Sequence, residues 1–258
     1  MVRRFEEISN NAWPALQTFQ YDGWVLRFAN GVTKRANSVG MLYPSTLDPD
    51  KKITFCEHLY KDQGITPCFK ITAAGDPEDI DQRLENRGYL VHSHISFQTL
   101  PLSTSGNSLL VAKNGQDTDA AGLRKTMVDT ILNSWWIDEF IRMNGFDPQR
   151  RSTYINIMER TLTPKCLISV LQEERTIGVG LGVAEGKYIG LFDIVVDPEC
   201  RNQGIGKRIV ETILRWGRDM GAEIAYLQVL TDNIPAINLY RNLGFSGIYQ
   251  YHYRMKFS

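Results

Sequence analysis

The stretch that decides the fold reads Phe192-Asp193-Ile194-Val195-Val196-Asp197-Pro198-Glu199-Cys200-Arg201-Asn202-Gln203-Gly204-Ile205-Gly206-Lys207. The β-branched run Ile194–Val196 predicts a buried strand, because such side chains pack well on a pleated surface. Asp197-Pro198 ends that strand, since proline has no N–H to donate to a neighbouring strand. The sequence therefore predicts a strand followed by a tight loop with glycines at positions 204 and 206.

Apolar side chains recur at helical spacing after this loop: Ile205, Ile209, Val210, Ile213, Leu214, Trp216 and Met220. This spacing predicts an amphipathic helix over residues 203–220 that stops at Gly221. Its start carries the basic residues Arg201, Lys207 and Arg208, although helix N-termini favour acidic ones, and each mismatch costs about 0.3–1 kcal/mol. A bound anion would reverse that sign, and the glycines would let backbone N–H groups close on it. The alternative is a surface turn with solvated basic residues.

The strand, the Val-Asp-Pro turn, Arg201-x-x-Gly204-x-Gly206 and the long amphipathic helix together resemble the acetyl-CoA signature of the GNAT superfamily of N-acetyltransferases. In that family the loop amides cradle the pyrophosphate of the cofactor, and Gln or Arg usually stands first, as Arg201 does here. The resemblance covers roughly residues 120–258 and implies acetyl-CoA as co-substrate. It implies these cofactor-binding residues in the loop: Arg201, Asn202, Gln203, Gly204, Ile205, Gly206 and Lys207.

Length and composition limit the class of protein. With 258 residues, 43% of them hydrophobic, the chain can form two domains with sizeable cores. Lys+Arg and Asp+Glu are equal at 29 each, which argues against a nucleic acid or an anionic membrane as the main partner. No apolar run approaches a membrane span, and the N-terminus is not a signal peptide. We therefore expect a cytoplasmic protein.

Cysteine and histidine usage gives no sign of a metal site. The four cysteines are scattered without a CxxC pair: Cys56, Cys68, Cys166 and Cys200. This usage predicts reduced, mostly buried thiols in a cytosolic protein. His92 and His94 alternate along a strand with no Cys or Asp at ligand spacing. The sequence therefore predicts no bound metal.

The pattern along the first half predicts alternating strands and helices. Strands are expected at 23–29, 33–39, 66–72 and 88–99, and helices at 48–63 and 76–86. Asn30-Gly31 is a hairpin turn signal between the first two strands. Residues 101–118, rich in Ser, Gly, Asn and Thr, predict a linker.

The second half is expected to begin with helices and to continue with a mixed sheet. Helices are predicted at 123–143, 148–162, 203–220 and 233–242, and strands at 166–172, 176–184, 189–196, 223–230 and 245–257. Gly178-Val-Gly180-Leu-Gly182 superficially matches a dinucleotide-binding pattern, but it alternates inside a predicted strand and no helix follows it. Its glycines instead indicate a bulge or close approach of another backbone.

The two halves show a weak internal repeat. Gly64 and Gly88 enclose a strand and a helix at a separation of 24, and Gly221 and Gly244 do so at a separation of 23. The equal order of elements predicts a duplicated α/β architecture: two GNAT-like folds in tandem, with mixed central sheets flanked by helices. We expect a GNAT-like domain over residues 1–105 and an active N-acetyltransferase domain over residues 118–258.

The first copy is expected to be degenerate. Where the second copy has its glycine loop, the first has Tyr43-Pro44-Ser45-Thr46-Leu47-Asp48, which offers no visible grip for a pyrophosphate. We therefore expect this copy to support the active half or to shape its substrate cleft. Its opening, including Asn11-Ala-Trp-Pro-Ala and Tyr21-Asp22-Gly23-Trp24, is similar to that of bacterial two-part GNAT proteins.

Three residues near the C-terminus share one face of a predicted helix: Asn233, Ala236 and Tyr240. By spacing alone they form either a ligand-binding wall or an ordinary cap, a packing alanine and a core tyrosine. The family resemblance implies that Asn233 contacts the pantetheine arm and that Tyr240 protonates the departing CoA thiolate. A phenol with a pKa near 10 can donate a proton to a thiolate with a pKa of about 8.5.

The resemblance also implies a backbone contact and leaves the general base open. In this fold the core strand separates from its neighbour, so that the backbone of Ile194, Val195 and Val196 can bond the pantetheine like an added strand. Asp193 is our candidate for the base that takes the proton of the amine, with a capping carboxylate as the alternative. Some family members use a glutamate three positions earlier, where this chain has Gly190.

The acceptor site is expected near the first helices of the second half. Trp135-Trp136-Ile137-Asp138-Glu139 combines aromatic rings and carboxylates, as a cationic amine requires. A packed helix with an acidic outer edge explains the same pattern.

The predicted function is transfer of an acetyl group from acetyl-CoA to a primary amine of a small molecule by direct attack in a ternary complex. No Cys or Ser–His pair is placed for covalent catalysis, which favours direct attack. Acetylation of a protein N-terminus or lysine is an alternative within enzymes, and a non-catalytic acyl-CoA sensor is the alternative outside them. The predicted partners are acetyl-CoA and the amine, and a homodimer is compatible with the sequence.

Overall fold

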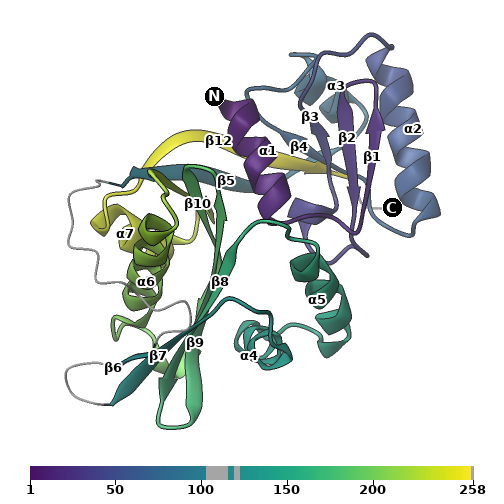
Figure 1. The fold of residues 1–258 in the computed structure, drawn as a ribbon. Helices are drawn as coiled ribbons and strands as arrows, with labels where there is room; N and C mark the ends of the chain where they lie inside the picture. The colour runs from purple at the N-terminus through teal and green to yellow at the C-terminus, as the bar shows by residue number, and fades with distance from the viewer. Residues whose placement is uncertain (103–115, 119–122, 257–258) are drawn as a thin grey trace. The chain divides into compact units, whose positions relative to one another are not determined.

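The computed structural model describes residues 1–102, 116–118 and 123–256 (Figure 1). Most of the predicted linker, residues 101–118, lies outside this described part. The chain divides into two compact units. Unit 1 comprises Met1–Phe97, Val229–Asn233 and Gly247–Ser258, and unit 2 comprises Gln98–Gln228 and Ile234–Ser246.

Unit 1 contains a mixed sheet with helices on both faces. Its elements are α1 (Val2–Ala12), β1 (Gln17–Tyr21), β2 (Trp24–Phe28), the 3-10 turn η1 (Lys34–Ala36), β3 (Val39–Met41), α2 (Pro49–Asp62), β4 (Cys68–Ile71), α3 (Ile80–Asn86), β5 (Leu90–Pro101) and β12 (Ser246–Met255). The strands lie in the order β1-β2-β3-β4-β12-β5. β3 and β4 are parallel, whereas β1–β2, β2–β3 and β4–β12 are antiparallel.

Alternation along β4 shows how the two faces of this sheet are covered. Phe69 belongs to the apolar core under α2 and α3, where its ring meets those of Trp24 and Tyr89 edge to face. Lys70, the next residue, points to the other face and forms a buried ion pair with Glu6 of α1 at 2.6 Å. The period-two pattern of a strand thus places Phe69 in the core on one face and the Lys70–Glu6 ion pair on the other.

Unit 2 also contains strands in mixed orientation, flanked by helices. Its elements are β6 (Gln116–Thr118), β7 (Arg124–Asp129), α4 (Ser134–Asn144), the 3-10 turn η2 (Pro148–Arg150), α5 (Arg151–Glu159), β8 (Lys165–Gln172), β9 (Arg175–Glu185), β10 (Tyr188–Val196), the 3-10 turn η3 (Pro198–Cys200), α6 (Ile205–Asp219), β11 (Ile224–Leu230) and α7 (Ile234–Asn242). The strands lie in the order β11-β10-β9-β8-β7-β6. β10 and β11 are parallel, and β6 to β10 pair antiparallel with their neighbours.

The helices of unit 2 cover both faces of its sheet (Figure 1). α6 and α7 lie on one side of β8–β10, and α4 and α5 lie on the other. Trp136 of α4 is fully buried, and its indole N–H donates to the Ile168 carbonyl at 3.0 Å. The strand, loop and helix predicted over residues 192–220 are present as β10, the loop and α6.

Three local predictions are wrong. The strand expected at residues 33–39 is replaced by η1, and β3 begins only at Val39. Residues 124–129, expected to be helical, form strand β7, because tertiary pairing with β8 outweighs a weak local preference. Asn30-Gly31 does not close a two-residue hairpin, since η1 separates β2 from β3. The tight hairpin lies at Asp22-Gly23, where Tyr21 pairs with Trp24 and both turn residues have positive φ.

The order strand, loop, helix, parallel strand, helix occurs twice, as β3–α2–β4–α3 and as β10–α6–β11–α7. The α/β fold with its mixed sheets and flanking helices is therefore as predicted. The compact units follow a different division from this repeat, because residues of β12 from Gly247 onward pair with β4 and belong to unit 1. The domain limits 1–105 and 118–258 describe the repeat and stay a prediction.

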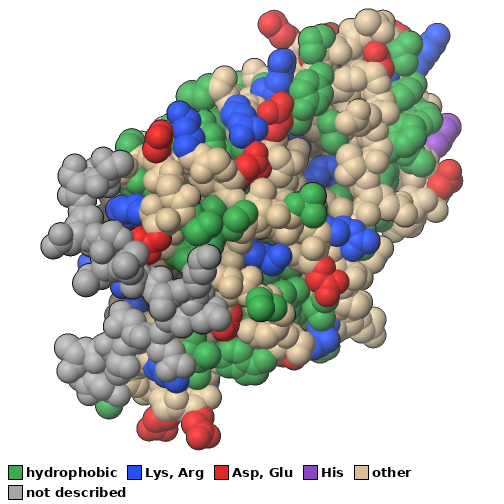
Figure 2. All heavy atoms as spheres, viewed as in Figure 1, with side chains coloured by type: hydrophobic (Ala, Val, Ile, Leu, Met, Phe, Trp, Pro, Cys, Tyr) green, Lys and Arg blue, Asp and Glu red, His purple; other side chains and the backbone are tan. Residues whose placement is uncertain are grey.

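The described residues contain no membrane-spanning helix and no cluster of metal ligands. On the face shown in Figure 2, basic and acidic side chains are interspersed, in line with the balanced charge of the sequence. No described helix is both long enough and apolar enough to cross a bilayer. Within the same residues, no three His, Cys, Asp or Glu side chains gather as a metal site would require.

Candidate active site

A row of glycines on β9 lets α6 lie close to the sheet. Each glycine lies beneath one isoleucine of the helix: Gly178 beneath Ile205, Gly180 beneath Ile209 and Gly182 beneath Ile213. A Cβ atom at position 178 or 182 would lie only 2.8 or 2.7 Å from the isoleucine above it. The glycines thus mark close helix approach, one of the two readings of their sequence pattern, and they fix the height of α6 above the strands.

The loop before α6 ends in a conformation that requires glycine. Gly204 is the N-cap residue with φ +80°, in the left-handed region that side chains disfavour, and no other atom lies within 4 Å of its Cβ position. α6 has no side-chain cap and no acidic residue in its first turn. Its first N–H groups, which have no acceptor inside the helix, therefore face the exposed loop. This end of α6 is suited to bind an anion.

Basic side chains surround this end of the helix, each with its own contact. Arg201 is exposed, and its Nε donates to the Val196 carbonyl at 3.4 Å. Lys207 lies 3.7 Å from Glu211 one turn along the helix, a solvent-exposed pair. Arg124 of β7 donates to the backbone and side-chain oxygens of Gln203, at 3.1 and 2.6 Å. Of the predicted loop residues, Arg201, Asn202, Gln203, Gly204 and Lys207 are exposed, Gly206 is half-buried and Ile205 is buried.

β10 and β11 separate in the middle of β10. Their parallel pairing runs from Tyr188 with Ile224 to Leu191 with Leu227, the last pair between them in the described chain. The other edge of β10 stays paired to β9 beyond a bulge, with Val195 opposite Val179. Ile194–Val196 therefore keeps one backbone edge outside the β10–β11 pairing, as the family resemblance implies for a pantetheine contact.

Asp193 lies at the bulge of β10. It is half-buried and has φ +49°, in the left-handed region that aspartate tolerates better than most residues. Gly190, three positions earlier, has no room for a side chain. A Cβ atom there would lie 2.5 Å from the Phe192 ring and 2.6 Å from the Tyr226 hydroxyl. A side chain at position 190 would require these rings to move, and the role of Asp193 as the base stays a prediction.

Tyr240 lies on α7, beside the start of α6. Its neighbour Leu239 is the side chain closest to the Cβ position of Gly206, at 3.3 Å. The Tyr240 phenol is 8% exposed and packs edge to face on Phe245, with ring centroids 5.8 Å apart. Burial raises the pKa of Tyr240 to about 12. The phenol therefore keeps its proton at neutral pH.

The other two predicted contacts, Asn233 and Ala236, lie at the start of α7. Asn233 is exposed, directly precedes the helix, and donates its backbone N–H to the Leu230 carbonyl at 3.1 Å. It belongs to unit 1, whereas Ala236 belongs to unit 2 and is half-buried in the first turn of α7. The contact of Asn233 with a cofactor held by the α6 loop stays a prediction.

The aromatic and acidic start of α4 is a packed helix with ion-paired carboxylates. Trp136 is buried, while Trp135 is 38% exposed. Asp138 pairs with Arg151 at 2.5 Å, and Glu139 pairs with Arg142 at 2.7 Å. Because both carboxylates already have cationic partners, the structure favours the packing interpretation over an amine site.

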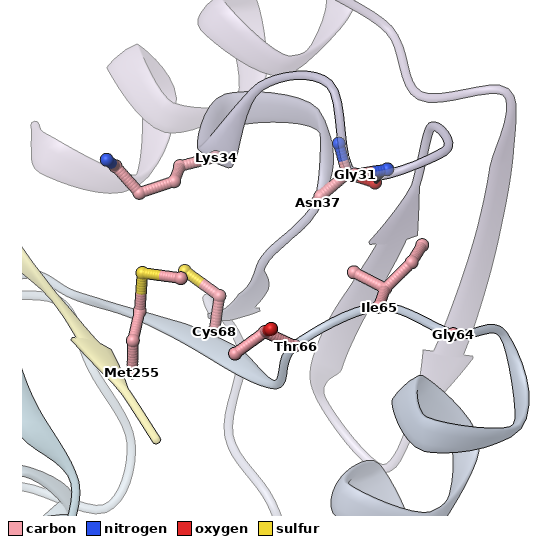
Figure 3. Close-up of a pocket in the computed structure, with 8 residues that line it drawn as sticks. All are labelled: Gly31, Lys34, Asn37, Gly64, Ile65, Thr66, Cys68 and Met255. Atoms are coloured by element: carbon pink, nitrogen blue, oxygen red, sulfur yellow. Dashed lines mark hydrogen bonds between the residues drawn. The ribbon is translucent and has the colours of Figure 1, made fainter. Parts of the chain in front are cut away.

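Unit 1 has a separate pocket of about 260 Å³ (Figure 3). Lys34 and Asn37, near η1, lie on one side, and Cys68 and Met255 on another. The Asn37 amide donates to and accepts from backbone groups, including those of Ala29, and so it is committed to the chain itself. No local sequence pattern predicted this pocket, because its lining comes from distant segments.

Two family descriptions match the chain. "Acetyltransferase (GNAT) family" matches residues 129–245, and "Probable histone acetyltransferase Rv0428c C-terminal" matches residues 1–82. A relative in Bacillus subtilis (strain 168), "Uncharacterized N-acetyltransferase YobR", is 33% identical over 262 residues, covering 99% of this chain and 98% of that protein. The chain belongs to the GNAT acetyltransferase family.

Solved GNAT structures share the fold across both halves. "GCN5-related N-acetyltransferase from Kribbella flavida" superposes with a TM-score of 0.68 at 12% identity, covering 100% of this chain and 96% of that one. "Tandem GNAT protein from the clavulanic acid biosynthesis pathway (without AcCoA)" gives a TM-score of 0.64 at 12% identity, covering 97% and 86%. The predicted tandem GNAT fold is confirmed.

Membership of this family makes the protein an acyltransferase, and GNAT enzymes generally use acetyl-CoA. The residues present fit that co-substrate. The uncapped end of α6 and the left-handed Gly204 suit a pyrophosphate, and the open edge of Ile194–Val196 suits an amide-bearing arm.

Proposed function

We propose that the protein transfers the acetyl group of acetyl-CoA to a primary amine of a small molecule, by direct attack of the amine on the thioester. The observation that carries the proposal is the start of α6. Its N-cap residue is Gly204, no side chain caps it, and basic residues border it. The active half is residues 118–258, and residues 1–105 form a degenerate copy without this arrangement.

In this proposal the backbone N–H groups of residues 201–207 bind the pyrophosphate, helped by the charges of Arg201 and Lys207. Ile194, Val195 and Val196 bond the pantetheine arm along the open edge of β10, and Asn233 and Ala236 contact it from the start of α7. Binding supplies an activated acyl thioester. Backbone N–H groups of the strand polarise its carbonyl, and the loop and strand together hold it in line with the amine.

Two side chains move protons. A primary amine with a pKa near 10.4 is mostly protonated, and freeing it at pH 7 costs about 4–5 kcal/mol. Asp193 takes that proton, directly or through water. Tyr240 gives its proton to the leaving thiolate, and its raised pKa keeps it protonated until that step. The protonated phenol favours an enzyme over an acyl-CoA sensor, since binding alone requires no acid.

The test measures release of the CoA thiol from acetyl-CoA against a panel of polyamines, aminoglycosides, amino acids and peptides. Turnover on a small amine supports the proposal. Turnover on peptides alone would favour acetylation of a protein N-terminus or lysine. If acetyl-CoA raises the Tm and no amine is acetylated, the sensor function replaces the enzymatic one.

A further inference from the structure

Asp197, the residue between β10 and the loop, engages all of its polar groups. Its backbone N–H donates to the Ile177 carbonyl at 3.0 Å, and its carbonyl accepts from the Cys200 N–H at 2.8 Å. Its Oδ1 accepts from the Glu199 N–H at 3.1 Å. These bonds fix the first turn of the loop to the end of β10 and to β9.

Two guanidinium groups bind the other carboxylate oxygen of Asp197. Arg142 of α4 donates to Oδ2 at 3.0 Å, and Arg175 of β9 donates to the same atom at 2.9 Å. Arg142 also donates to the Thr176 carbonyl at 3.0 Å and pairs with Glu139 at 2.7 Å. We call Asp197, Arg142 and Arg175 the Asp197 clamp. It joins the beginning of the loop to α4 and to β9.

The charge of Asp197 is well supported although the side chain is only 4% exposed. Burial acts to raise its pKa, but the bonds from Arg142, the Glu199 N–H and Arg175 outweigh it and hold the pKa below its usual range. Replacing the carboxylate with a neutral amide would remove the counter-charge that the two guanidinium groups share. Each of them would keep only its own glutamate, Glu139 for Arg142 and Glu199 for Arg175. The loop would then lose the position that both of them impose.

The clamp and the open N-terminus of α6 lie at the two ends of one short loop, residues 197–204. We propose that Asp197 is a positioning residue for the reaction. Through Arg142 and Arg175 it holds the loop so that the amides of residues 201–206 point where the pyrophosphate binds. This inference rests on the proposed function, in which those amides receive the pyrophosphate.

The test compares two acetyl donors in Asp197→Asn. Acetyl-CoA carries the pyrophosphate, whereas S-acetyl-pantetheine lacks it and cannot benefit from a positioned loop. A displaced loop should lower kcat/KM for acetyl-CoA by about 10- to 100-fold, chiefly through KM, and leave kcat/KM for S-acetyl-pantetheine nearly unchanged. A general structural defect would lower kcat/KM equally for both donors, and that result would overturn the inference.

Glu223→Gln is the matched control, because it makes the same carboxylate-to-amide change in another ion pair of unit 2. Glu223 pairs with Lys187 at 3.7 Å on the surface, away from the loop. The ratio of the two donors should stay at the parental value in this variant. If the ratio falls as far as in Asp197→Asn, then loss of any ion-paired carboxylate changes it, and the Asp197 clamp does not position the loop.

Arg175→Gln decides the matter if Asp197→Asn does not fold. Arg175 is 53% exposed, so that its loss removes one donor to Asp197 without opening the core. The donor ratio should fall in the same direction by a smaller factor, and an unchanged ratio would refute the clamp. A parent protein that uses both donors equally and does not bind CoA would instead refute the proposed function itself.

Discussion

The loops before α2 and before α6 occupy equivalent places in the two copies of the repeat, yet the first is filled by the chain's own carboxylates. Asp22 accepts from the N–H groups of Thr46 and Leu47 at 2.9 and 2.8 Å and lies 3.2 Å from the Lys52 ammonium. Asp76 accepts from the Ser45 N–H at 2.7 Å. In the described chain, the loop before α6 has no corresponding carboxylate cap.

This difference gives a physical reason to expect that the first copy is degenerate. A helix N-terminus favours negative charge, whether it comes from a ligand or from a side chain. In unit 1 the hydrogen bond from the Leu47 N–H, with those from Thr46 and Lys52, holds the pKa of Asp22 well below its usual range. An internal anion therefore stands where the second copy, in our proposal, receives the pyrophosphate. The loop of the first copy thus differs from that of the second in two ways: it lacks the glycines, and the Asp22 carboxylate occupies it.

The largest effect is expected when the loop before α6 receives a carboxylate, as the loop before α2 already has. Gly204→Glu should weaken acetyl-CoA binding by about 100- to 1,000-fold, since like charges in contact cost several kcal/mol. Isothermal titration calorimetry measures the change. Gly221→Glu is the matched control, because Gly221 also has an open, left-handed conformation with φ +85°. Equal binding by Gly204→Glu and the parent would show that the anion site is misplaced.

Removing the proton donor separates binding from chemistry in the second copy. Tyr240→Phe should lower kcat by about 100-fold and leave the Kd for acetyl-CoA nearly unchanged, because the ring keeps its packing against Phe245. Stopped thiol-release assays and calorimetry give the two quantities. Unchanged kcat would remove Tyr240 from the mechanism.

Removing the Asp22 carboxylate from the loop before α2 tests whether that loop can then bind an external anion. Asp22→Gly keeps the positive φ of the turn but leaves the N–H groups of Thr46 and Leu47 without their acceptor. The Lys52 ammonium loses the carboxylate and keeps its bond to the backbone carbonyl of residue 22. The Tm should fall by several degrees at pH 7, and inorganic phosphate should restore part of the loss.

The pH dependence of the same variant gives a further check. The pKa of Asp22 is lowered on folding, so that its stabilisation is present above about pH 4, the unfolded pKa, and is lost as the pH falls further. The Tm difference between parent and Asp22→Gly should therefore shrink below that pH. Asp22→Asn, which keeps an acceptor oxygen, should lose less stability and gain less from phosphate. Equal phosphate responses in all three proteins would contradict internal occupation.

The smallest expected effect concerns the alkaline side of the pH–rate profile. Because the pKa of Tyr240 is about 12, its protonated, donating form persists up to pH 10. Between pH 8 and pH 10, the kcat of the parent should therefore depend on pH in the same way as the kcat of Tyr240→Phe. A decline centred near pH 9 and absent from the variant would mean that the phenol titrates there.

Local patterns in the sequence sufficed for the part of the fold that carries the candidate site. Ile194–Val196, the glycine loop and the stripe from Ile205 to Trp216 lie within one continuous stretch, so their periodicities predicted β10, the loop and α6. Residues 124–129 were mistaken for helix because their strand depends on β8, more than thirty residues away. Such pairing leaves no local trace.

The residues that distinguish the two loops could not be predicted for the same reason. Asp22 reaches Leu47 across 25 positions, and Arg142 reaches Asp197 across 55. Asp22-Gly23 is a usable hairpin signal, whereas the hairpin was expected at Asn30-Gly31. The carboxylate contacts that follow from that hairpin appear only once the tertiary structure is formed.

The pairing of β12 with β4 has a consequence for biosynthesis. The sheet of unit 1 includes residues from Gly247 onward, which are translated after all of unit 2. Unit 1 thus cannot complete its sheet until unit 2 has been synthesised, and a stop codon before β12 would damage unit 1. Variants of the full chain, not excised fragments, are the proper material for dissecting the two copies.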